Sequence, residues 1–275
     1  MSGTLYLCAT PIGNLGDITQ RCLDTLAMVD LIAAEDTRQT VKLLNHFHIS
    51  AKMTSYYEHN KRDKGAYLLS LLQEGKNIAV VSDAGTPGIS DPGEELVAAC
   101  IAQGIPVTSV PGAAAVISAV VTSGLATGRF CFEGFLSVNK KQRREHLLDI
   151  RDERRTMVFY EAPHKLRATL QDLYDTLGDR RISIARELTK KFEEICLMTL
   201  SQAIEKYEQT PPKGEFALVI EGKTERDMED YTDLSIEEHV KRYTDTGMSE
   251  MEAIKAAAKD RGLRKNEVYA MIKKR

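Results

Sequence analysis

The strongest constraint on the fold of this chain is a regular alternation of short apolar runs with helix-like segments. The apolar runs have the length of buried strands and lie at 5–9, 31–34, 78–82 and 105–110. Segments with helical periodicity separate them. This alternation is typical of a largely parallel sheet that helices cover on both faces. We therefore expect an α/β domain over residues 1–121.

A second α/β domain is expected over residues 122–224. Strand-like runs recur there at 156–160, 181–185 and 216–221, with helical segments between them. Connections are longer and more charged than in the first domain. We expect a cleft between the two domains, which is a preferred position for ligand sites.

The last part of the chain, residues 232–275, is predicted to be helical throughout. It follows an acidic segment without strand signals, 223–233, which we interpret as a linker. Gly262 marks a bend, and Lys265 opens the final helix. Two short helices joined by a turn with glycine fit a helix-turn-helix-like arrangement. A small helical cap or a dimerisation element fits the same pattern.

A loop of small residues follows the third apolar run. Between Ser82 and Gly93 it contains three glycines and two prolines. In open α/β sheets, loops at the carboxyl ends of strands bind ligands, and small side chains let a ligand lie against the backbone. The next helix is expected to begin near Asp91, with this residue as its cap and Pro92 in its first turn.

The same loop limits the kind of ligand. It has neither the GxxxxGK[ST] pattern that cradles phosphates nor GxGxxG, and it contains no lysine. With Asp83 and Thr86 in a narrow loop, a nucleoside or an amino-acid-like ligand fits better than a triphosphate.

The charge of the chain is nearly balanced, with a formal net charge of −3. Two segments are locally basic: residues 140–155 have seven Lys/Arg against four Asp/Glu, and residues 259–275 have seven against two. Solvated surfaces account for most segments of this kind. Two of them in one chain also make a polyanionic partner worth considering.

Cysteine and histidine usage points to a cytoplasmic protein without a metal site. The five cysteines form no CxxC pattern and no Cys/His cluster, so we expect them to be reduced core residues. His46, His48 and His59 have no carboxylate or cysteine partners at a metal-ligand spacing. The chain has no apolar stretch approaching 18 residues, and residues 1–4 do not resemble a signal peptide.

Polar residues gather where four of the predicted strands end. They are the groups Glu35-Asp36-Thr37-Arg38, Ser82-Asp83, Tyr160 to His164 and Arg186 to Lys190. A carboxylate or a lysine in a shared cleft could accept a proton from a hydroxyl nucleophile. Arg38, Arg186 and Lys190 could hold phosphate groups of a substrate. Ion pairs that tie loops together explain these residues equally well.

Seven motifs, in this order, are similar to those of one known family. They are Thr10-Pro11-Ile12-Gly13-Asn14-Leu15-Gly16-Asp17-Ile18-Thr19, Ala34-Glu35-Asp36-Thr37-Arg38, Val81 to Gly93, Pro111-Gly112, Phe132-Glu133-Gly134-Phe135-Leu136, Phe159 to His164, and Ala185 to Lys190. On these motifs the chain resembles the ribosomal RNA small subunit methyltransferase I family, which is part of the wider tetrapyrrole-methylase superfamily. The resemblance covers residues 5–222 closely and the tail more loosely.

This resemblance implies an enzyme that uses S-adenosylmethionine to methylate the ribose 2′-hydroxyl of a cytidine in small-subunit ribosomal RNA. It implies two α/β domains with the cofactor in the cleft between them, a small C-terminal helix-turn-helix-like domain, and a homodimer. The partner would be the small-subunit RNA or the small ribosomal subunit itself.

The resemblance also implies a set of cofactor-binding residues. They are Pro11, Asp83, Gly85, Thr86, Ile89, Ala114, Ala115, Tyr160, Leu188 and Ala217. The superfamily often has a Gly-Asp-Pro triplet where this chain has Gly85-Thr86-Pro87, so an acid is missing at Thr86. Asp83 is expected to take over part of its role.

For the implied reaction, the candidate bases are Glu35, Asp36 and Glu187, while Arg38, Arg186 and Lys190 would position the RNA. Two alternatives stay open. One is a methylase of a tetrapyrrole, a diphthamide precursor or another small substrate, which the basic segments and the helical tail disfavour. The other is a non-catalytic RNA-binding or assembly factor, which the intact loop after the third strand disfavours.

Overall fold

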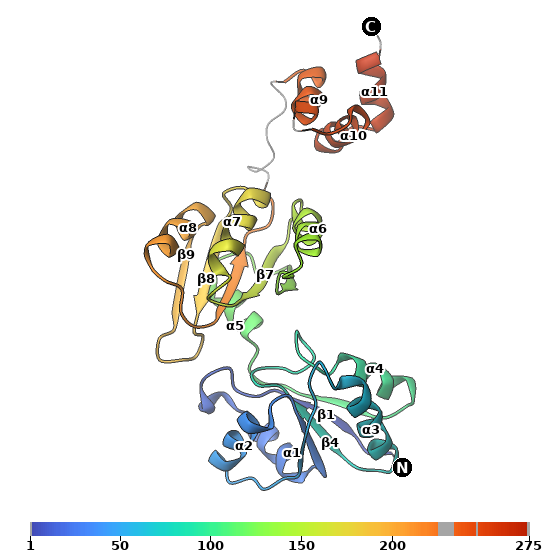
Figure 1. Cartoon of the computed structure of the whole chain (residues 1–275), viewed down its shortest axis with the longest axis vertical. Helices are drawn as coiled ribbons and strands as arrows, with labels where there is room; N and C mark the ends of the chain where they lie inside the picture. Colours follow the sequence, from blue (N-terminus) through green and yellow to red (C-terminus); the bar gives the residue numbers. More distant parts are fainter. Residues whose placement is uncertain (1, 225–233, 246, 274–275) are drawn as a thin grey trace. The chain divides into compact units, whose positions relative to one another are not determined.

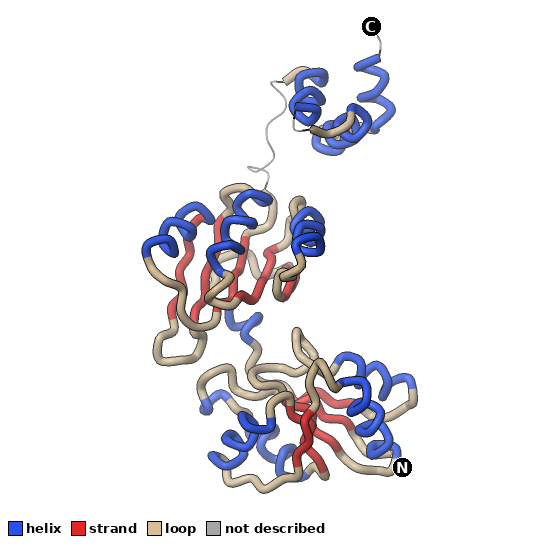
Figure 2. Tube along the Cα trace, in the orientation of Figure 1, coloured by secondary structure: helices blue, strands red, loops and turns tan. Residues whose placement is uncertain are grey.

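The structure, a computed structural model, describes residues 2–224, 234–245 and 247–273. Contacts within the chain divide it into two units, Met1–Gly222 and Lys223–Arg275 (Figure 1). In the described residues, the strands belong to the first unit, and the second consists of helices and loops (Figure 2). Most of the expected linker, residues 225–233, lies outside the described residues.

The first sheet of unit 1 is parallel throughout, as the alternation of segments predicts. Its order is β3-β2-β4-β1-β5. The strands are β1 (Leu5–Cys8), β2 (Leu31–Ala34), β3 (Met53–Ser55), β4 (Ile78–Val81) and β5 (Val107–Val110). Because the strands are parallel, all their carboxyl ends meet at one edge of the sheet.

Helices cover both faces of this sheet (Figure 1). They are α1 (Gln20–Met28), α2 (Thr37–His46), α3 (Lys61–Gln73) and α4 (Glu94–Ala102), with a short 3-10 turn η1 (Leu15–Asp17) before them. The alternation of side chains along β4 supplies two cores. Ala79 and Val81 pack with residues of α1 and α2, whereas Ile78 and Val80 pack with residues of α3 and α4. Thr19 caps α1, as predicted, by accepting a hydrogen bond from the backbone N–H of Cys22.

The expected start of α4 at Asp91 is wrong. The helix begins at Glu94, and its N-cap is Gly93, whose φ of 147° suits glycine but few other residues. Gly93 also lies against the backbone of Gly88, where a Cβ would come within 3.3 Å of the Gly88 Cα. This close approach shortens the helix and leaves Asp91 in the preceding loop.

The second sheet of unit 1 is mixed. Its order is β6-β7-β10-β8-β9, in which β6 and β7 are parallel and every other pair is antiparallel. The strands are β6 (Phe130–Gly134), β7 (Thr156–Glu161), β8 (Arg181–Arg186), β9 (Glu194–Thr199) and β10 (Phe216–Ile220). The sequence predicts the three central strands. It misses β3, β6 and β9, which are all edge strands and largely half-buried, so that their apolar pattern is diluted.

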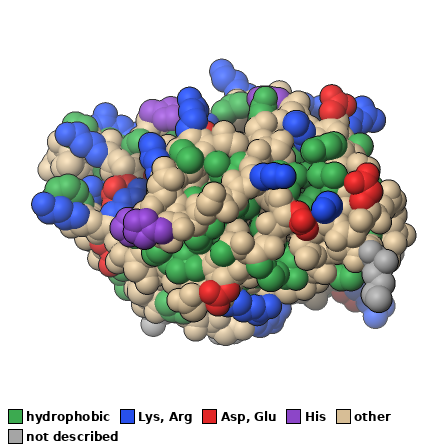
Figure 3. Space-filling view, turned by 90° about the horizontal axis from the view of Figure 1, so that it is seen from below, with side chains coloured by type: hydrophobic (Ala, Val, Ile, Leu, Met, Phe, Trp, Pro, Cys, Tyr) green, Lys and Arg blue, Asp and Glu red, His purple; other side chains and the backbone are tan. Residues whose placement is uncertain are grey.

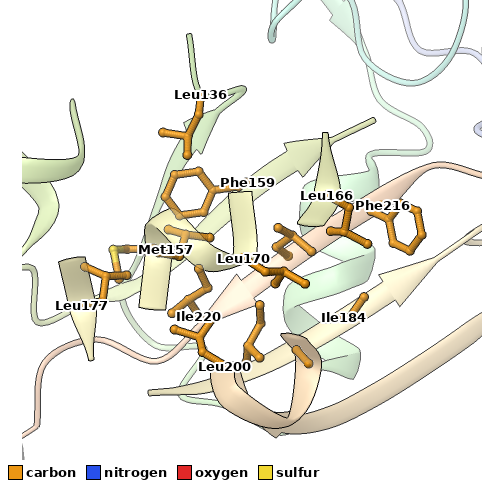
Figure 4. Close-up of a cluster of buried hydrophobic side chains, with 14 of the residues drawn as sticks. Leu136, Met157, Phe159, Leu166, Leu170, Leu177, Ile184, Leu200, Phe216 and Ile220 are labelled. Carbon is orange, nitrogen blue, oxygen red and sulfur yellow. The ribbon is translucent and has the colours of Figure 1, made fainter. Parts of the chain in front are cut away.

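One face of the second sheet carries the largest core of the chain. Helices α6 (Lys140–Ile150), α7 (Leu166–Leu177) and α8 (Leu200–Gln209) cover it. Figure 4 shows this cluster, where Phe159 and Met157 from β7 lie among leucines of α7 and α8, and Leu136 closes it beyond the end of β6.

Helix α5 (Ala115–Thr122) covers the other face of the second sheet. Val116, Ala119 and Val120 pack against Val158 of β7 and Val219 of β10. The helix follows β5 in the chain but buries its apolar side on strands that come much later. The boundary expected at residues 121/122 falls within the last turn of this helix, and it stays a prediction.

The second unit contains three helices within the described residues: α9 (Ile236–Asp245), α10 (Glu250–Asp260) and α11 (Lys265–Lys273). Gly262, with φ 63°, lies in the turn between the last two helices, as expected. His239 of α9 is fully buried, and its Nδ1 accepts a hydrogen bond from Nε of Arg261 at 3.0 Å. The helix-turn-helix-like character of this unit stays a prediction.

The surface of the chain mixes charges of both signs. On the face drawn in Figure 3, basic and acidic side chains alternate with hydrophobic ones. Part of the basic segment 140–155 is neutralised by ion pairs: Arg143 lies 2.6 Å from Asp172, and Arg155 lies 2.7 Å from Glu153. No helix within the described ranges is long and apolar enough to cross a bilayer.

Candidate active site

The loop after β4 is held against the ends of the neighbouring strands. The backbones of Thr10, beyond β1, and Gly85 exchange two hydrogen bonds of 2.8 and 3.1 Å. Thr86 Oγ1 donates to the carbonyl of Ala113, beyond β5, at 3.2 Å. A Cβ on Gly85 would lie 3.3 Å from Cγ2 of Ile12, and the φ of 81° at this position also favours glycine. The loop therefore has a fixed shape at the carboxyl edge of the first sheet.

Two acidic groups, one after β2 and one after β4, are hydrogen-bonded to each other's backbone. Glu35 Oε2 accepts from the N–H of Asp83 at 3.1 Å, and Asp83 Oδ1 accepts from the N–H of Asp36 at 3.1 Å. Burial raises the pKa of Glu35, as do the neighbouring charges of Asp83 and Asp36. Burial, together with the charge of Asp36, also raises the pKa of Asp83. Asp36 itself is held by Arg38 at 2.7 Å, which lowers its pKa to about 2.

Asp91 is the third acid of this group. Burial and the nearby charges of Glu35 and Asp83 raise its pKa to about 7, although a hydrogen bond with Ser82 acts in the opposite direction. Together the three residues form an acidic end of the site, in which Asp91 changes its charge near neutral pH. Such strongly shifted groups concentrate at functional sites.

A cavity of about 590 Å³ opens beside this loop. Its volume is in the usual range for sites that bind small molecules and cofactors. It is lined by one of the three candidate bases, Glu35, and by all but one of the expected cofactor-binding residues: Asp83, Gly85, Thr86, Ile89, Ala114, Ala115, Tyr160, Leu188 and Ala217. Pro11 does not line it, whereas its neighbour Ile12 does.

The wall opposite the loop comes from the second sheet and α5. Tyr160, near the end of β7, accepts a hydrogen bond from the backbone N–H of Val116 at 2.8 Å. This bond satisfies one of the free N–H groups at the start of α5. Burial raises the pKa of the Tyr160 hydroxyl, which keeps it neutral near neutral pH. Ala185 and Ala217 line the floor of the cavity with small, almost fully buried side chains.

The remaining predicted residues do not line the cavity: Asp36, Arg38, Arg186, Glu187 and Lys190. Lys190 Nζ pairs with Glu187 Oε1 at 2.9 Å and with Glu215 Oε2 at 2.8 Å. Desolvation opposes the ionisation of Glu187, but the N–H of Glu215 and the Lys190 ammonium outweigh it, so its pKa is lowered. Arg186 pairs with Glu194 at 3.1 Å. These residues form ion pairs in the structure, and their roles towards a substrate stay a prediction.

Several residues that were not among the predicted catalytic or cofactor-binding residues also line the cavity. They include Ile12, Ser90, Asp91, Phe135, Glu215 and Phe216, together with Glu161 and His164 from the polar group that the sequence places at a strand end. Glu161 is buried, and its carboxylate accepts hydrogen bonds from the N–H of Ala162 and the hydroxyl of Thr169 at 2.8 and 2.5 Å. It therefore fixes the loop that carries His164. For Asp91 the sequence signal was present but was assigned to helix capping.

Within the described ranges, no group of three or more His, Cys, Asp or Glu side chains is arranged to hold a metal ion. All five cysteines are free thiols. Cys8 of β1, Cys22 of α1 and Cys100 of α4 are buried, as expected of core cysteines, whereas Cys131 and Cys196 lie half-buried on the edge strands β6 and β9.

Comparison with known proteins supplies a family. Residues 4–204 match the model of the family described as Tetrapyrrole (Corrin/Porphyrin) Methylases. A protein of Synechocystis sp. named "Ribosomal RNA small subunit methyltransferase I" is 49% identical over 270 residues, which cover 98% of this chain and 97% of the relative. A protein of the same name from Halalkalibacterium halodurans is 50% identical over 270 residues, covering 97% of this chain and 93% of the relative.

A third relative with this name is shorter. The protein of Thermotoga maritima is 48% identical over 221 residues, which cover 99% of that protein but 80% of this chain. About a fifth of the present chain therefore has no counterpart in it.

Solved structures share the fold of unit 1. A diphthine synthase aligns with a TM-score of 0.61 at 12% identity, covering 81% of this chain and 91% of its own. A uroporphyrin-III C-methyl transferase from Thermus thermophilus, solved with S-adenyl homocysteine, aligns with a TM-score of 0.56 at 17% identity. The alignment covers 80% of this chain and 98% of the transferase. At these identities the similarity concerns the fold alone.

The raised pKa of Asp91 predicts a pH-dependent cost to stability. A carboxyl whose pKa rises from 3.8 to about 7 on folding stabilises the fold below pH 3.8, and this contribution is lost as the pH rises through 7. The D91N variant should therefore melt at a higher temperature than the wild type at pH 8, with a smaller difference at pH 5. The control is D149N, which changes an exposed acid of α6. A D91N difference that does not vary with pH would contradict the assignment.

Proposed function

The chain belongs to the tetrapyrrole (corrin/porphyrin) methylase family, and we propose that it transfers a methyl group from S-adenosylmethionine to a cytidine ribose of small-subunit ribosomal RNA. The observation that carries the proposal is the match, over nearly the full length of both proteins, to relatives named for methylation of this RNA. The position of modification, the 2′-hydroxyl, comes from the motif resemblance.

The cavity has the features that this cofactor requires. Gly85 and the alanines at 114, 115, 185 and 217 leave room for a flat adenosine to approach the backbone. Glu35, Asp83 and Asp91 place negative charge near a ligand that carries positive charge on its sulfonium and amino groups. When bound, S-adenosylmethionine supplies an activated methyl group. The protein then has mainly to align the methyl group with the accepting oxygen.

A ribose hydroxyl is a weak nucleophile, so a base that accepts its proton would assist the transfer. Of the three candidates, Glu35 alone faces the cavity, and its pKa is raised. Asp36 forms an ion pair with Arg38, and Glu187 forms one with Lys190. We therefore assign the role of base to Glu35 and structural roles to the other two.

Substitution of the three acids tests this assignment. We expect E35Q to lower the single-turnover rate of methyl transfer by about 100-fold or more, the usual contribution of a general base. D36N and E187Q should stay near the wild-type rate, because neither side chain lines the cavity. Calorimetry with S-adenosylhomocysteine shows whether E35Q still binds the cofactor product. If all three variants retain full rate, alignment alone suffices and there is no general base among them.

The cationic candidates would act at the entrance rather than in the cavity. The Arg38 side chain is 86% exposed even though it pairs with Asp36, so a phosphate can still approach its guanidinium. Arg186 and Lys190 are paired with acids and would have to exchange these partners for phosphates.

A ribosomal substrate also implies that the enzyme acts in the cytoplasm.

The direct test uses purified small ribosomal subunits that lack the modification. With labelled S-adenosylmethionine, we expect label in the RNA at one cytidine, at a linkage that resists alkaline cleavage because its 2′-oxygen is blocked. A parallel reaction offers a tetrapyrrole in place of the subunits, and label on the tetrapyrrole but not on RNA would establish the small-substrate alternative. If the protein neither transfers label nor binds the cofactor, the non-catalytic factor is the better explanation.

We also propose that the protein is a homodimer, with a contact on the free side of α5. Ile117 and Val121 of α5 are exposed, as is Leu197 of the edge strand β9. A Cβ on Gly124 would lie 3.4 Å from Leu197 Cδ2, so the end of α5 adjoins this strand. An apolar helix side next to an open sheet edge is a surface that oligomers commonly cover.

A charge placed on this surface tests the dimer. We expect wild type to sediment as a dimer and V121R to shift towards monomer, because a buried arginine without a partner is costly. The matched control is I101R on α4, since Ile101 and Val121 are both 66% exposed. A wild-type monomer at micromolar concentration, or the same shift in I101R, would contradict this contact.

A further inference from the structure

Phe135 lies on the cavity with 54% of its surface exposed. Among the large hydrophobic residues that are exposed in the described part of the chain, only Phe135 and Ile89 line the cavity. Other residues that line the cavity are much less exposed: Leu188 is 9% exposed and Ala217 is 4% exposed. The cavity therefore has a buried interior of small side chains and an exposed aromatic ring on its wall.

A β-bulge directs this ring towards the cavity. In β6, Phe132 pairs with Val158, but Gly134 pairs with the very next residue of β7, Phe159, so β6 contains one extra residue. One extra residue exchanges the two faces of a strand for everything that follows. Without it, the alternation would turn Phe135 towards the core under α6 and α7. With it, Leu136 fills that core beside Phe159 (Figure 4).

An aromatic contact with β7 holds the ring. Phe135 makes an edge-to-face contact with Tyr160, with ring centroids 5.7 Å apart and planes at 62°. Tyr160 is held in turn by Phe132, at 4.9 Å, and by the hydrogen bond from Val116. Because Phe135 is 54% exposed beside this contact, part of its ring remains accessible to a ligand. Gly134, with φ 67°, gives the backbone the turn that this placement requires.

We propose that the exposed part of the Phe135 ring is the surface on which the base of the target nucleotide stacks. This inference rests on the proposed function, because it concerns the RNA substrate of the same site. A ribose can reach the cavity only if its nucleotide leaves the RNA stack, and the base then loses its stacking partners. An exposed aromatic ring replaces them, as it does in other proteins that bind single-stranded RNA.

The surroundings of the ring favour a base over a phosphate as its ligand. Glu35, Asp83 and Asp91 make the cavity acidic, so the RNA backbone is repelled from it. The ring carries no charge and can accept the planar, uncharged base. His164, also exposed on the cavity, offers a second ring on the loop after β7.

The chain contains no tryptophan, which permits a direct test of stacking. F135W introduces a single fluorophore on the cavity, and Y174W introduces one on α7, where Tyr174 is 37% exposed and does not line the cavity. Each variant is saturated with S-adenosylhomocysteine and titrated with a short oligocytidylate RNA. We expect saturable quenching of F135W fluorescence by the RNA and no saturable change in Y174W.

Two results of this titration would overturn the proposal. In the first, S-adenosylhomocysteine alone quenches F135W and the RNA adds nothing, so that the ring belongs to the cofactor site. In the second, the RNA quenches Y174W equally, so that binding is not specific to the cavity. Neither result depends on turnover. A protein that stacks the RNA on F135W but transfers no methyl group would contradict the proposed reaction and leave this inference standing.

Kinetics on unmodified small subunits give a second readout. We expect F135A to lower kcat/KM by roughly 5- to 150-fold, the range that corresponds to the loss of one base–aromatic stack. Its affinity for S-adenosylhomocysteine and its melting temperature should be close to those of the wild type. F135W should retain most of the activity, whereas F135L should not, because leucine fills space without a π-face. Equal activity of F135L and F135W would show that only volume matters.

Discussion

The site depends on one arrangement, the packing of α5, which follows the last strand of the first sheet in the chain, on the second sheet. The helix leaves β5 of the first sheet and buries Val116, Ala119 and Val120 on the second. The hydrogen bond from Val116 to Tyr160 fixes the start of the helix at the point where the loop after β4 approaches. Residues from both sheets therefore line a single cavity. Without this helix, neither sheet would present more than half of a binding surface.

The electrostatics of the cavity follow from the parallel order of the first sheet. The strands β2 and β4 are neighbours, so the acids that follow them are brought together at the same edge. Burial raises the pKa values of Glu35, Asp83 and Asp91, and the charge of at least one neighbouring carboxylate raises each of them further. A fold of this type thus concentrates negative charge at the ligand-binding edge without any long-range loop. That charge attracts a cationic cofactor and repels the phosphates of an RNA, so that only the reacting nucleotide of a polyanion is expected to enter the cavity.

Much of the fold and part of the site could be predicted from the sequence, and the exceptions have physical causes. Continuous apolar runs identify the buried strands, whereas the half-buried edge strands β3, β6 and β9 lack this signal. Asp91 has the residue type of a helix cap, and only the backbone of Gly93 shows that the helix begins later. Phe135 was quoted within a motif, but its direction depends on a bulge that no pattern in the sequence marks.

The shared position of α5 determines where unit 1 can be divided into fragments. A break after Thr122 would leave the second sheet with an uncovered apolar face, and the fragment that contains the helix would expose Val116, Ala119 and Val120 to water. A break between Val110 and Ala113 keeps α5 with the strands it covers. Two chains separated there would each retain their own core, and contacts such as the hydrogen bond from Thr86 to Ala113 could join them again. The connection after β5, rather than the one after α5, is thus the natural position for a split enzyme whose activity reports on reassembly.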